Sequence, residues 1–487
     1  MFGFCSRQPK APERVSTDTV IPVGFYDGTI LYRNLVMYTL FVFDDVLDHQ
    51  RLRTCLERVV SRPGWNKLGA RLRRNKNGQL EHHIPASFSK GRPPIGYQHL
   101  DLSDVAMEDH AIASQIPRAP RDGPPVIVGD PEQFADLYSG PGIPKSIDDF
   151  LYTDRPQLGL RVVSFKNKTI VVMYWIHLAF DAIAKRSILE AWMLMLQGRE
   201  DEILEPLPPD KYILENIGKN PPEPHVLAKH HMSTLSLVPW VLRNAYALTI
   251  APKDNRMLCV PAAYFTKLKE KALADLTKQA AAAGDTEKPF ISEGDVLMAW
   301  VARQCMGTSS KNPETMVNVQ QVYQWRPALA DLIPDGRPVL HNCIGFITTM
   351  VSVKDICQKP LSYLASQIRE TIKTQGSREQ VEAHASLILK DPIARGLPVF
   401  GKSSMQLFLF SNWQKANMYS VDLSAAAVKP RNTPLVPSYV QSTREPYTFN
   451  ESFFYVGKDP EGNHWIVGYR MRGHWDKMAK ELAAEEI

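Results

Sequence analysis

Cysteine is scarce in this sequence, and long apolar runs are missing from it. Six cysteines occur among 487 residues, far apart and without a C-x-x-C pair, which favours free thiols in a reducing compartment over a disulfide framework. A membrane-spanning helix needs about 18 consecutive apolar residues, whereas the longest run here, residues 35–43, has the length of a strand. The first ten residues lack the apolar core of a signal peptide. We therefore expect a cytoplasmic protein with no membrane span.

A strong excess of charge of either sign is also missing. The 57 basic and 52 acidic residues give a net charge of +5, and the basic residues are scattered. A nucleic-acid binder needs a basic face or arm, so we expect no nucleic acid as a partner. The densest basic run, residues 71–76, stands beside a polar turn and is interpreted as the solvated end of a hairpin. Metal-binding spacings are absent, and the pairs His82-His83 and His230-His231 are interpreted as surface residues, so we expect no metal.

The remaining composition is that of an ordinary globular protein, 44% hydrophobic, in a chain long enough for two or three domains. The stretch 203–226 contains six prolines and many charges, and this change of composition predicts a domain boundary. We therefore divide the chain into an N-terminal domain (1–205), a crossover linker (206–255) and a C-terminal domain (256–487). Both halves mix strands with helices, which indicates an α/β or α+β class.

Hydrophobic patterns place the individual elements. Buried strands are predicted at residues 35–43, 158–165, 169–176, 256–261, 317–323, 344–353, 405–410, 452–456 and 464–470. Helices are predicted from Asp44 or Asp45 to residue 60, and at 182–196, 262–283 and 296–305. A hairpin is predicted from 68–72 and 80–84, while residues 85–148, rich in proline and glycine, are expected to be mostly loop.

The sharpest chemical signal is the segment His177-Leu178-Ala179-Phe180-Asp181, between the predicted strand 169–176 and the helix 182–196. A histidine on such a turn is well placed to meet a substrate, and its ordinary pKa of about 6.5 suits a general base. Asp181 can orient the imidazole or hold the turn through another partner. A histidine and an aspartate that only tie one turn together give the same pattern, so the spacing alone does not decide between these interpretations.

A phosphate-binding pattern also occurs, because residues 396–403 match G-x-x-x-x-G-K-[ST]. That loop works between a strand and a helix, whose N-terminus holds the phosphate. Residues 387–395 are a poor strand, and 405–410 predict a strand where a helix is needed. We interpret the match as coincidence and expect no ATP. A G-x-S-x-G nucleophile motif is absent, and Cys305 and Cys343 lie in apolar runs typical of buried thiols.

Several segments together suggest a family. His177 to Asp181 match an H-x-x-x-D-G motif in which Ala182 replaces the glycine, and Asp422 alone survives from a D-F-G-W-G motif, here Asp422-Leu423-Ser424-Ala425-Ala426. The pattern P-x-x-a-G-R-L, a serine-capped apolar helix and a G-N pair before a strand are echoed at 62–72, 292–300 and 340–346. With these motifs in this order along nearly the whole chain, the sequence resembles the BAHD acyltransferases, in particular the fungal trichothecene 3-O-acetyltransferases.

The resemblance implies two similar α/β domains, like chloramphenicol acetyltransferase, with a channel between them. It also implies a monomer with no permanently bound cofactor. Acyl-CoA, with acetyl-CoA as the default donor, would meet a small hydroxylated acceptor, an apolar natural product, at His177, the general base. Asp181 and Asp422 would have structural roles, and Arg326 is the candidate partner of Asp422.

Two alternatives stay open. One is acyl transfer from a carrier-protein thioester, as in condensation domains, which usually have a second histidine where this chain has Ile176. The other is a scaffold of the same fold that has lost catalysis, as the eroded D-F-G-W-G motif suggests.

Overall fold

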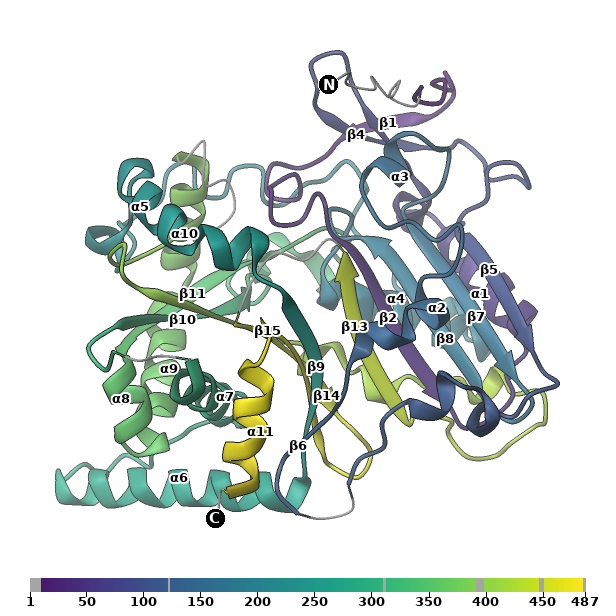
Figure 1. Ribbon diagram of the computed structural model, residues 1–487. Helices are drawn as coiled ribbons and strands as arrows, with labels where there is room; N and C mark the ends of the chain where they lie inside the picture. The colour runs from purple at the N-terminus through teal and green to yellow at the C-terminus, as the bar shows by residue number, and fades with distance from the viewer. Residues whose placement is uncertain (1–9, 121–122, 310–311, 391–397, 446–450, 485–487) are drawn as a thin grey trace, which may run out of the picture.

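The described residues form three β-sheets with helices packed against them (Figure 1). The computed structural model describes residues 10–120, 123–309, 312–390, 398–445 and 451–484. The first large sheet has the strand order β13 (Tyr439–Glu445), β2 (Val36–Phe43), β8 (Thr169–Ile176), β7 (Leu158–Phe165) and β5 (Gly96–Leu102). The second has the order β11 (Ile344–Ser352), β10 (Met316–Gln324), β12 (Gln406–Asn412), β14 (Ser452–Lys458), β15 (His464–Met471), β9 (Lys253–Val260) and β6 (Val126–Gly129). A small sheet joins β1 (Thr19–Pro22), β4 (Leu80–Ile84) and β3 (Arg71–Arg74).

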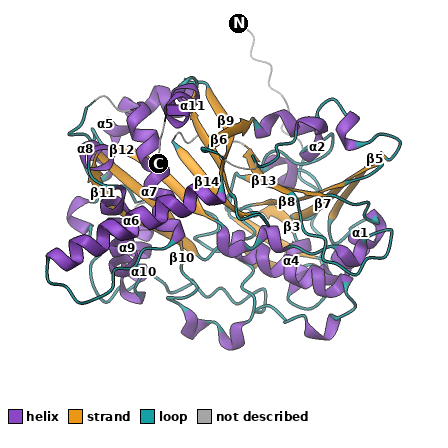
Figure 2. Ribbon diagram, turned by 90° about the horizontal axis from the view of Figure 1, so that it is seen from below, coloured by secondary structure: helices purple, strands orange, loops and turns teal. Residues whose placement is uncertain are grey.

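Helices complete this α/β fold, which confirms the predicted class. They are α1 (His49–Val60), α2 (Ala135–Tyr138), α3 (Asp148–Leu151), α4 (Ala182–Leu196), α5 (Thr234–Ala245), α6 (Ala262–Ala282), α7 (Glu293–Ser309), α8 (Val353–Gln358), α9 (Leu361–Gln375), α10 (Arg378–Lys390) and α11 (His474–Ala484). Helices α1 and α4 pack together against one face of the first sheet (Figure 2). Of the described helices, none is both long enough and apolar enough to cross a bilayer.

The strands that lead to the site are the ones that the sequence predicts best. β7 and β8 occupy the predicted residues, and every residue of both is buried. A strand covered on both faces has a continuous apolar run, and the polar turn at 166–168 separates the two runs sharply. Helix α4 also has the predicted bounds. Helix α1 begins at His49, later than expected, because Asp48 rather than Asp44 or Asp45 accepts hydrogen bonds from its first-turn N–H groups.

Two strands do not follow the predicted division of the chain. β6 comes from the N-terminal half but pairs with β9 in the second large sheet, and β13 comes from the C-terminal half but pairs with β2 in the first. Each is the edge strand of the sheet that it joins. Helix α5 lies inside the stretch expected to be a linker. The division at residues 205 and 256 therefore stays a prediction, and the two sheets exchange strands across it.

The region 85–148, expected to be mostly loop, contains β5, β6 and α2, and α3 begins at its last residue. β5 is the edge strand of the first sheet and pairs in parallel with β7. Its sequence, GYQHLDL, contains no run of apolar residues, and six of its seven residues are only partly buried. A short, half-exposed edge strand gives a much weaker apolar signal than a central one, which explains why composition alone suggested a loop.

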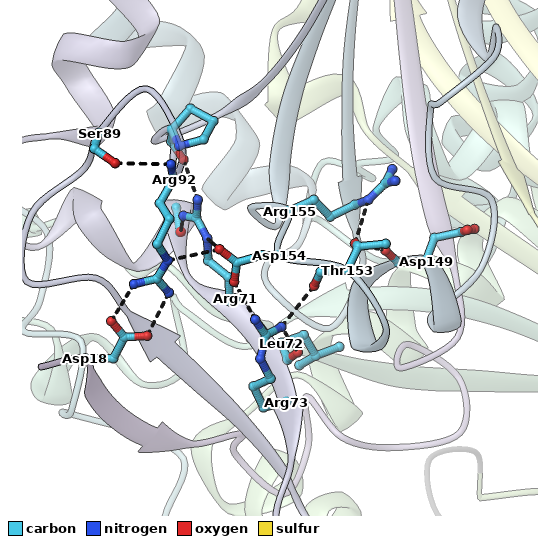
Figure 3. Close-up of polar contacts among 12 residues, drawn as sticks. Asp18, Arg71, Leu72, Arg73, Ser89, Arg92, Asp149, Thr153, Asp154 and Arg155 are labelled. Carbon is cyan, nitrogen blue, oxygen red and sulfur yellow. Dashed lines mark hydrogen bonds and ion pairs between the residues drawn. The ribbon is translucent and has the colours of Figure 1, made fainter. Parts of the chain in front are cut away.

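The basic run 71–76 is not wholly solvated, contrary to the prediction. Arg71 and Arg73 lie on β3 with buried side chains. Figure 3 shows the arginines meeting Asp154: Arg73 pairs with one carboxylate oxygen, and Arg92 donates from Nε to the other at 2.9 Å. Arg92 also pairs with Asp18 at 2.8 Å. These ion pairs tie the small sheet to the segment before β7, and the acidic partners are too far away in the sequence to be foreseen.

Candidate active site

A cavity of about 560 Å³ lies between the two large sheets. We call it the central cavity. The first sheet, its helix α4 and the segments next to β2 and β8 contribute Tyr32, Leu35, Met37, Trp175, His177 and Lys185. The second sheet contributes residues of β10 and β12, and the beginning of α7 completes the wall. Its walls are mostly apolar. This arrangement confirms the expected channel between two α/β units and places His177 in its wall.

His177 occupies the turn between β8 and α4, and its backbone is held on both sides. Its N–H donates to the Leu35 carbonyl at 2.8 Å, and its carbonyl accepts a hydrogen bond from Asn342 Nδ2 at 2.9 Å. The imidazole stacks on the ring of Tyr32, with centroids 4.9 Å apart. The turn therefore presents the imidazole to the cavity in a fixed position.

The surroundings of His177 favour the neutral imidazole. Burial lowers its pKa below 6.5; its own carbonyl and Asp181 oppose this shift, and the Arg444 guanidinium reinforces it. A histidine with a lowered pKa is unprotonated at neutral pH, which is the form that a general base needs.

Asp181 holds the turn through partners other than the imidazole. Its Oδ1 accepts from the N–H groups of Ile183 and Ala184 at 3.0 Å, which caps α4. Its Oδ2 accepts from Arg326 at 2.8 Å and from the Cys343 N–H at 2.9 Å. Burial would raise the pKa of Asp181, but Arg326 and these N–H groups lower it below 3.8. Of the two roles considered for Asp181, these contacts favour the one in which it holds the turn through another partner. That partner, Arg326, connects the turn to the other half of the fold.

Asp422 does not pair with Arg326, which corrects the expected pairing. Its Oδ1 instead accepts from the N–H groups of Ser424 and Leu435, at 2.9 and 2.8 Å. The residues after it form a short 3₁₀ turn (Ser424–Ala426), whose last carbonyl accepts the Asp48 N–H at the start of α1. The turn needs no positive φ angle, so the loss of both glycines leaves its backbone unstrained.

A buried carboxylate behind His177 escaped the sequence analysis. Asp27 accepts from the backbone N–H and from Nδ2 of Asn342 at 2.8 and 2.7 Å, and the same Nδ2 reaches the His177 carbonyl. Burial raises the pKa of Asp27 to about 7. Asn342 belongs to the segment that echoes the G-N motif, but no pattern around Asp27 marks it, since 315 residues separate the two.

Lys185 is a second residue that the sequence analysis missed. Its side chain is fully buried under the cavity, and Nζ donates to Thr39 Oγ1 and to Met418 Sδ, both at 3.0 Å. The rings of Trp175 and Trp413 lie 5.1 and 5.0 Å from Nζ. Burial lowers the pKa of Lys185 to about 7. Within the part of the chain that the structure describes, no carboxylate forms an ion pair with it.

Other predicted features have mixed outcomes. Residues 398–403 of the phosphate-binding pattern lead into the strand β12 and not into a helix, as expected, while Gly396 and Leu397 lie outside the described residues. Cys305 and Cys343 are buried thiols, as predicted. The pair His82-His83 is buried in β4 and not at the surface. Among the described residues, no group of three or more His, Cys, Asp or Glu side chains is arranged to hold a metal ion.

Comparisons with known proteins identify the family of this chain. The model of the Transferase family matches residues 143–427. The chain is 34% identical to transcriptional regulator calD of Penicillium decumbens over the full length of both chains, and 30% identical to acetyltransferase adrJ of Penicillium rubens over 98% of each. The crystal structure of TRI101 from F. graminearum, complexed with coenzyme A and T-2 mycotoxin, has a TM-score of 0.67 at 13% identity and covers 96% of this chain and 98% of that one. The chain therefore belongs to the Transferase family, the BAHD-type acyltransferases that its motifs predict.

Proposed function

We propose that this protein is an acyl-CoA-dependent O-acyltransferase, with acetyl-CoA as donor, and that it esterifies a hydroxyl group of a small secondary metabolite. The observation that carries the proposal is His177, an imidazole with a lowered pKa in the wall of a cavity shared by two sheets. The TRI101 structure holds coenzyme A and a mycotoxin in the same fold, and several relatives are named acetyltransferases. We also propose that the protein acts as a cytoplasmic monomer.

The reaction needs a single proton carrier. The imidazole of His177 takes the proton of the acceptor hydroxyl as that oxygen attacks the thioester carbonyl carbon. The tetrahedral oxyanion then collapses, so that the carbon–oxygen bond of the ester remains and the carbon–sulfur bond breaks. The leaving thiolate takes the proton back from the imidazolium, which gives the ester and free coenzyme A. General-base assistance of this kind contributes about 10² to 10⁴ in rate, and holding both substrates together removes much of the entropy cost.

The residues around His177 support it structurally. Asp181 and Arg326 fix the turn against the second half of the fold, and Asn342 holds the carbonyl of His177. Asp422 acts further away, where it shapes the loop that meets α1. Apolar residues dominate the cavity wall, among them Leu35, Met37, Phe346, Phe410 and Phe454. Such a wall suits an acceptor with a large apolar body and one reactive hydroxyl.

The name of calD suggests a regulator, but the densest basic run of this chain does not form a free basic surface. Arg71 and Arg73, in the densest basic run, are held in buried ion pairs and cannot contact a phosphate backbone. The carrier-protein and inactive-scaffold alternatives are separated from our proposal by experiment.

The test is the release of thiol from acetyl-CoA in the presence of a panel of small apolar alcohols. His177→Ala should reduce turnover at least about tenfold and leave the melting temperature close to that of the wild type. His230→Ala removes an exposed histidine and is the matched control. Turnover of His177→Ala near the wild-type rate would overturn the proposed role of the imidazole.

A thermal-shift comparison of acetyl-CoA, free coenzyme A and Mg-ATP tests the donor. A ligand that binds only the folded protein raises the melting temperature. A rise with the coenzyme A ligands alone supports the proposal, and a rise with Mg-ATP alone contradicts it and favours the phosphate-binding pattern. No shift with any of the three contradicts it in favour of a carrier-bound donor or an inactive scaffold.

A further inference from the structure

A stripe of large apolar side chains on α5 and on the π-helical turn after it, η7 (Tyr246–Ile250), faces solvent. Leu235 is 84% exposed and Ile250 is 73% exposed, and Val238, Leu242 and Tyr246 are also exposed. Monomeric soluble proteins rarely leave several large apolar residues together on one surface, and such patches mark interaction sites. We call these five residues the α5 stripe.

The α5 stripe follows the helical repeat. Its members are three or four residues apart, so they lie on one face of the helix. The opposite face attaches α5 to the protein: Trp240 is buried, packs with Met232, Val399 and Met405, and donates from Nε1 to the Met405 carbonyl at 3.2 Å. The helix is therefore anchored by its inner face while its outer face is apolar. In both views it lies at the outer edge of the molecule (Figures 1 and 2).

The charged residues that flank the stripe in the sequence have one sign. Between Glu223 and Asp254 the sequence contains no acidic residue, but it contains Lys229, Arg243 and Lys253. Arg243 and Lys229 are exposed. Apolar side chains on one face with basic residues beside them are the composition of helices that lie in the interface of an anionic membrane. A protein partner would not require acidic residues to be absent over such a length of chain.

We propose that α5 and η7 dock the protein on the surface of an anionic lipid bilayer. The α5 stripe enters the boundary between headgroups and acyl chains, Tyr246 lies at the level of the headgroups, and Lys229 and Arg243 contact lipid phosphates. Docking of this kind is peripheral and does not require a membrane-spanning helix. The inference rests on the surface of α5 and η7 and on the basic residues Lys229 and Arg243, and it is independent of the proposed acyl transfer.

Co-sedimentation of the full chain with vesicles tests the proposal. We expect stronger binding to vesicles of phosphatidylcholine mixed with phosphatidylserine than to vesicles of phosphatidylcholine alone. The triple variant Leu235→Ser/Leu242→Ser/Ile250→Ser should lower the partition coefficient at least about tenfold. Leu204→Ser/Val428→Ser changes exposed apolar residues outside the stripe and is the matched control. Lys229→Gln/Arg243→Gln should weaken binding to the anionic vesicles only.

The substituted side chains are exposed, so the variants should melt at the wild-type temperature. A change in vesicle binding then reports on the surface of the protein and not on its folding. If the wild type does not sediment with either vesicle, or if the triple variant binds as the wild type does, the proposal is overturned. A concentration-dependent dimer that the triple variant abolishes, without vesicle binding, would assign the stripe to a second copy of the chain instead. Since vesicle binding is measured without substrate, its failure leaves the acyltransferase proposal unaffected.

Discussion

Replacing Lys185 with methionine should make the protein more stable than the wild type at neutral pH, and this gain should shrink as the pH rises. The folded protein holds this ammonium group under two tryptophan rings, with a hydroxyl and a thioether as its hydrogen-bond partners. Burial lowers its pKa from 10.5 to about 7. The unfolded chain therefore binds a proton more readily than the folded one between these two pH values. Stability of the wild type should increase over that range.

The magnitude follows from the size of the pKa difference. At about 1.4 kcal/mol per unit the full pKa difference is worth about 5 kcal/mol. Because half of the folded lysine is already neutral at pH 7, burial of Lys185 costs somewhat less there, about 4 kcal/mol of unfolding free energy. Methionine fills a similar volume and gives up the hydrogen bond to Thr39, worth about 1 kcal/mol. The net gain at pH 7 is about 3 kcal/mol. For a chain of this length that is a rise of about 3 °C in melting temperature.

The assay is a series of melting curves of wild type and Lys185→Met from pH 7 to 9.5. The difference should shrink to about zero at the upper end, where the wild type loses most of its penalty. Lys267→Met is the control, because that exposed lysine keeps its hydration when the chain folds. A variant that is less stable than the wild type at pH 7, or a gain that does not change with pH, would refute the reasoning.

Three further predictions concern the site. Asp181→Asn should keep the cap of α4 but leave Arg326 without its carboxylate, so unfolding measurements should show a loss of about 3 kcal/mol; adding Arg326→Met should recover part of that loss. Asn342→Ala should lower kcat more than it changes KM, and should move the acid limb of the pH profile, which a purely structural role would not do. The kcat/KM of the wild type should be flat at neutral pH and fall only below pH 6.5, because the lowered pKa keeps His177 neutral; an inflection above 6.5 would contradict this.

The accuracy of the sequence-based predictions depends on how far each signal extends along the chain. β7, β8 and α4 were predicted to the residue because apolar runs and a polar turn define them locally. β13 was missed because only the first two residues of its sequence, YVQSTRE, are apolar, so no apolar run marks it as a strand. Its partner β2 is about four hundred residues earlier in the chain. Pairing over such a distance leaves no local pattern.

The same distinction holds at the site. His177 and Asp181 form a motif within five residues, so the sequence reveals them. Asp27 and Lys185 contact residues 315 and 146 positions away, and single residues without a pattern cannot be selected from the sequence. Arg326 was assigned to Asp422 for the same reason: its partner Asp181 is 145 residues away in the sequence, and no local pattern distinguishes the two carboxylates.

The exchange of β6 and β13 limits how far the two large sheets can move apart. Along the chain, β6 of the second sheet stands between β5 and β7 of the first, and β13 of the first stands between β12 and β14 of the second. The chain therefore crosses from one sheet to the other before and after each exchanged strand. Separating the sheets would stretch all four of these connections, so we expect the width of the central cavity to change little when a ligand enters. Selection among acceptors by size then follows from the shape of the folded cavity and needs no closing motion.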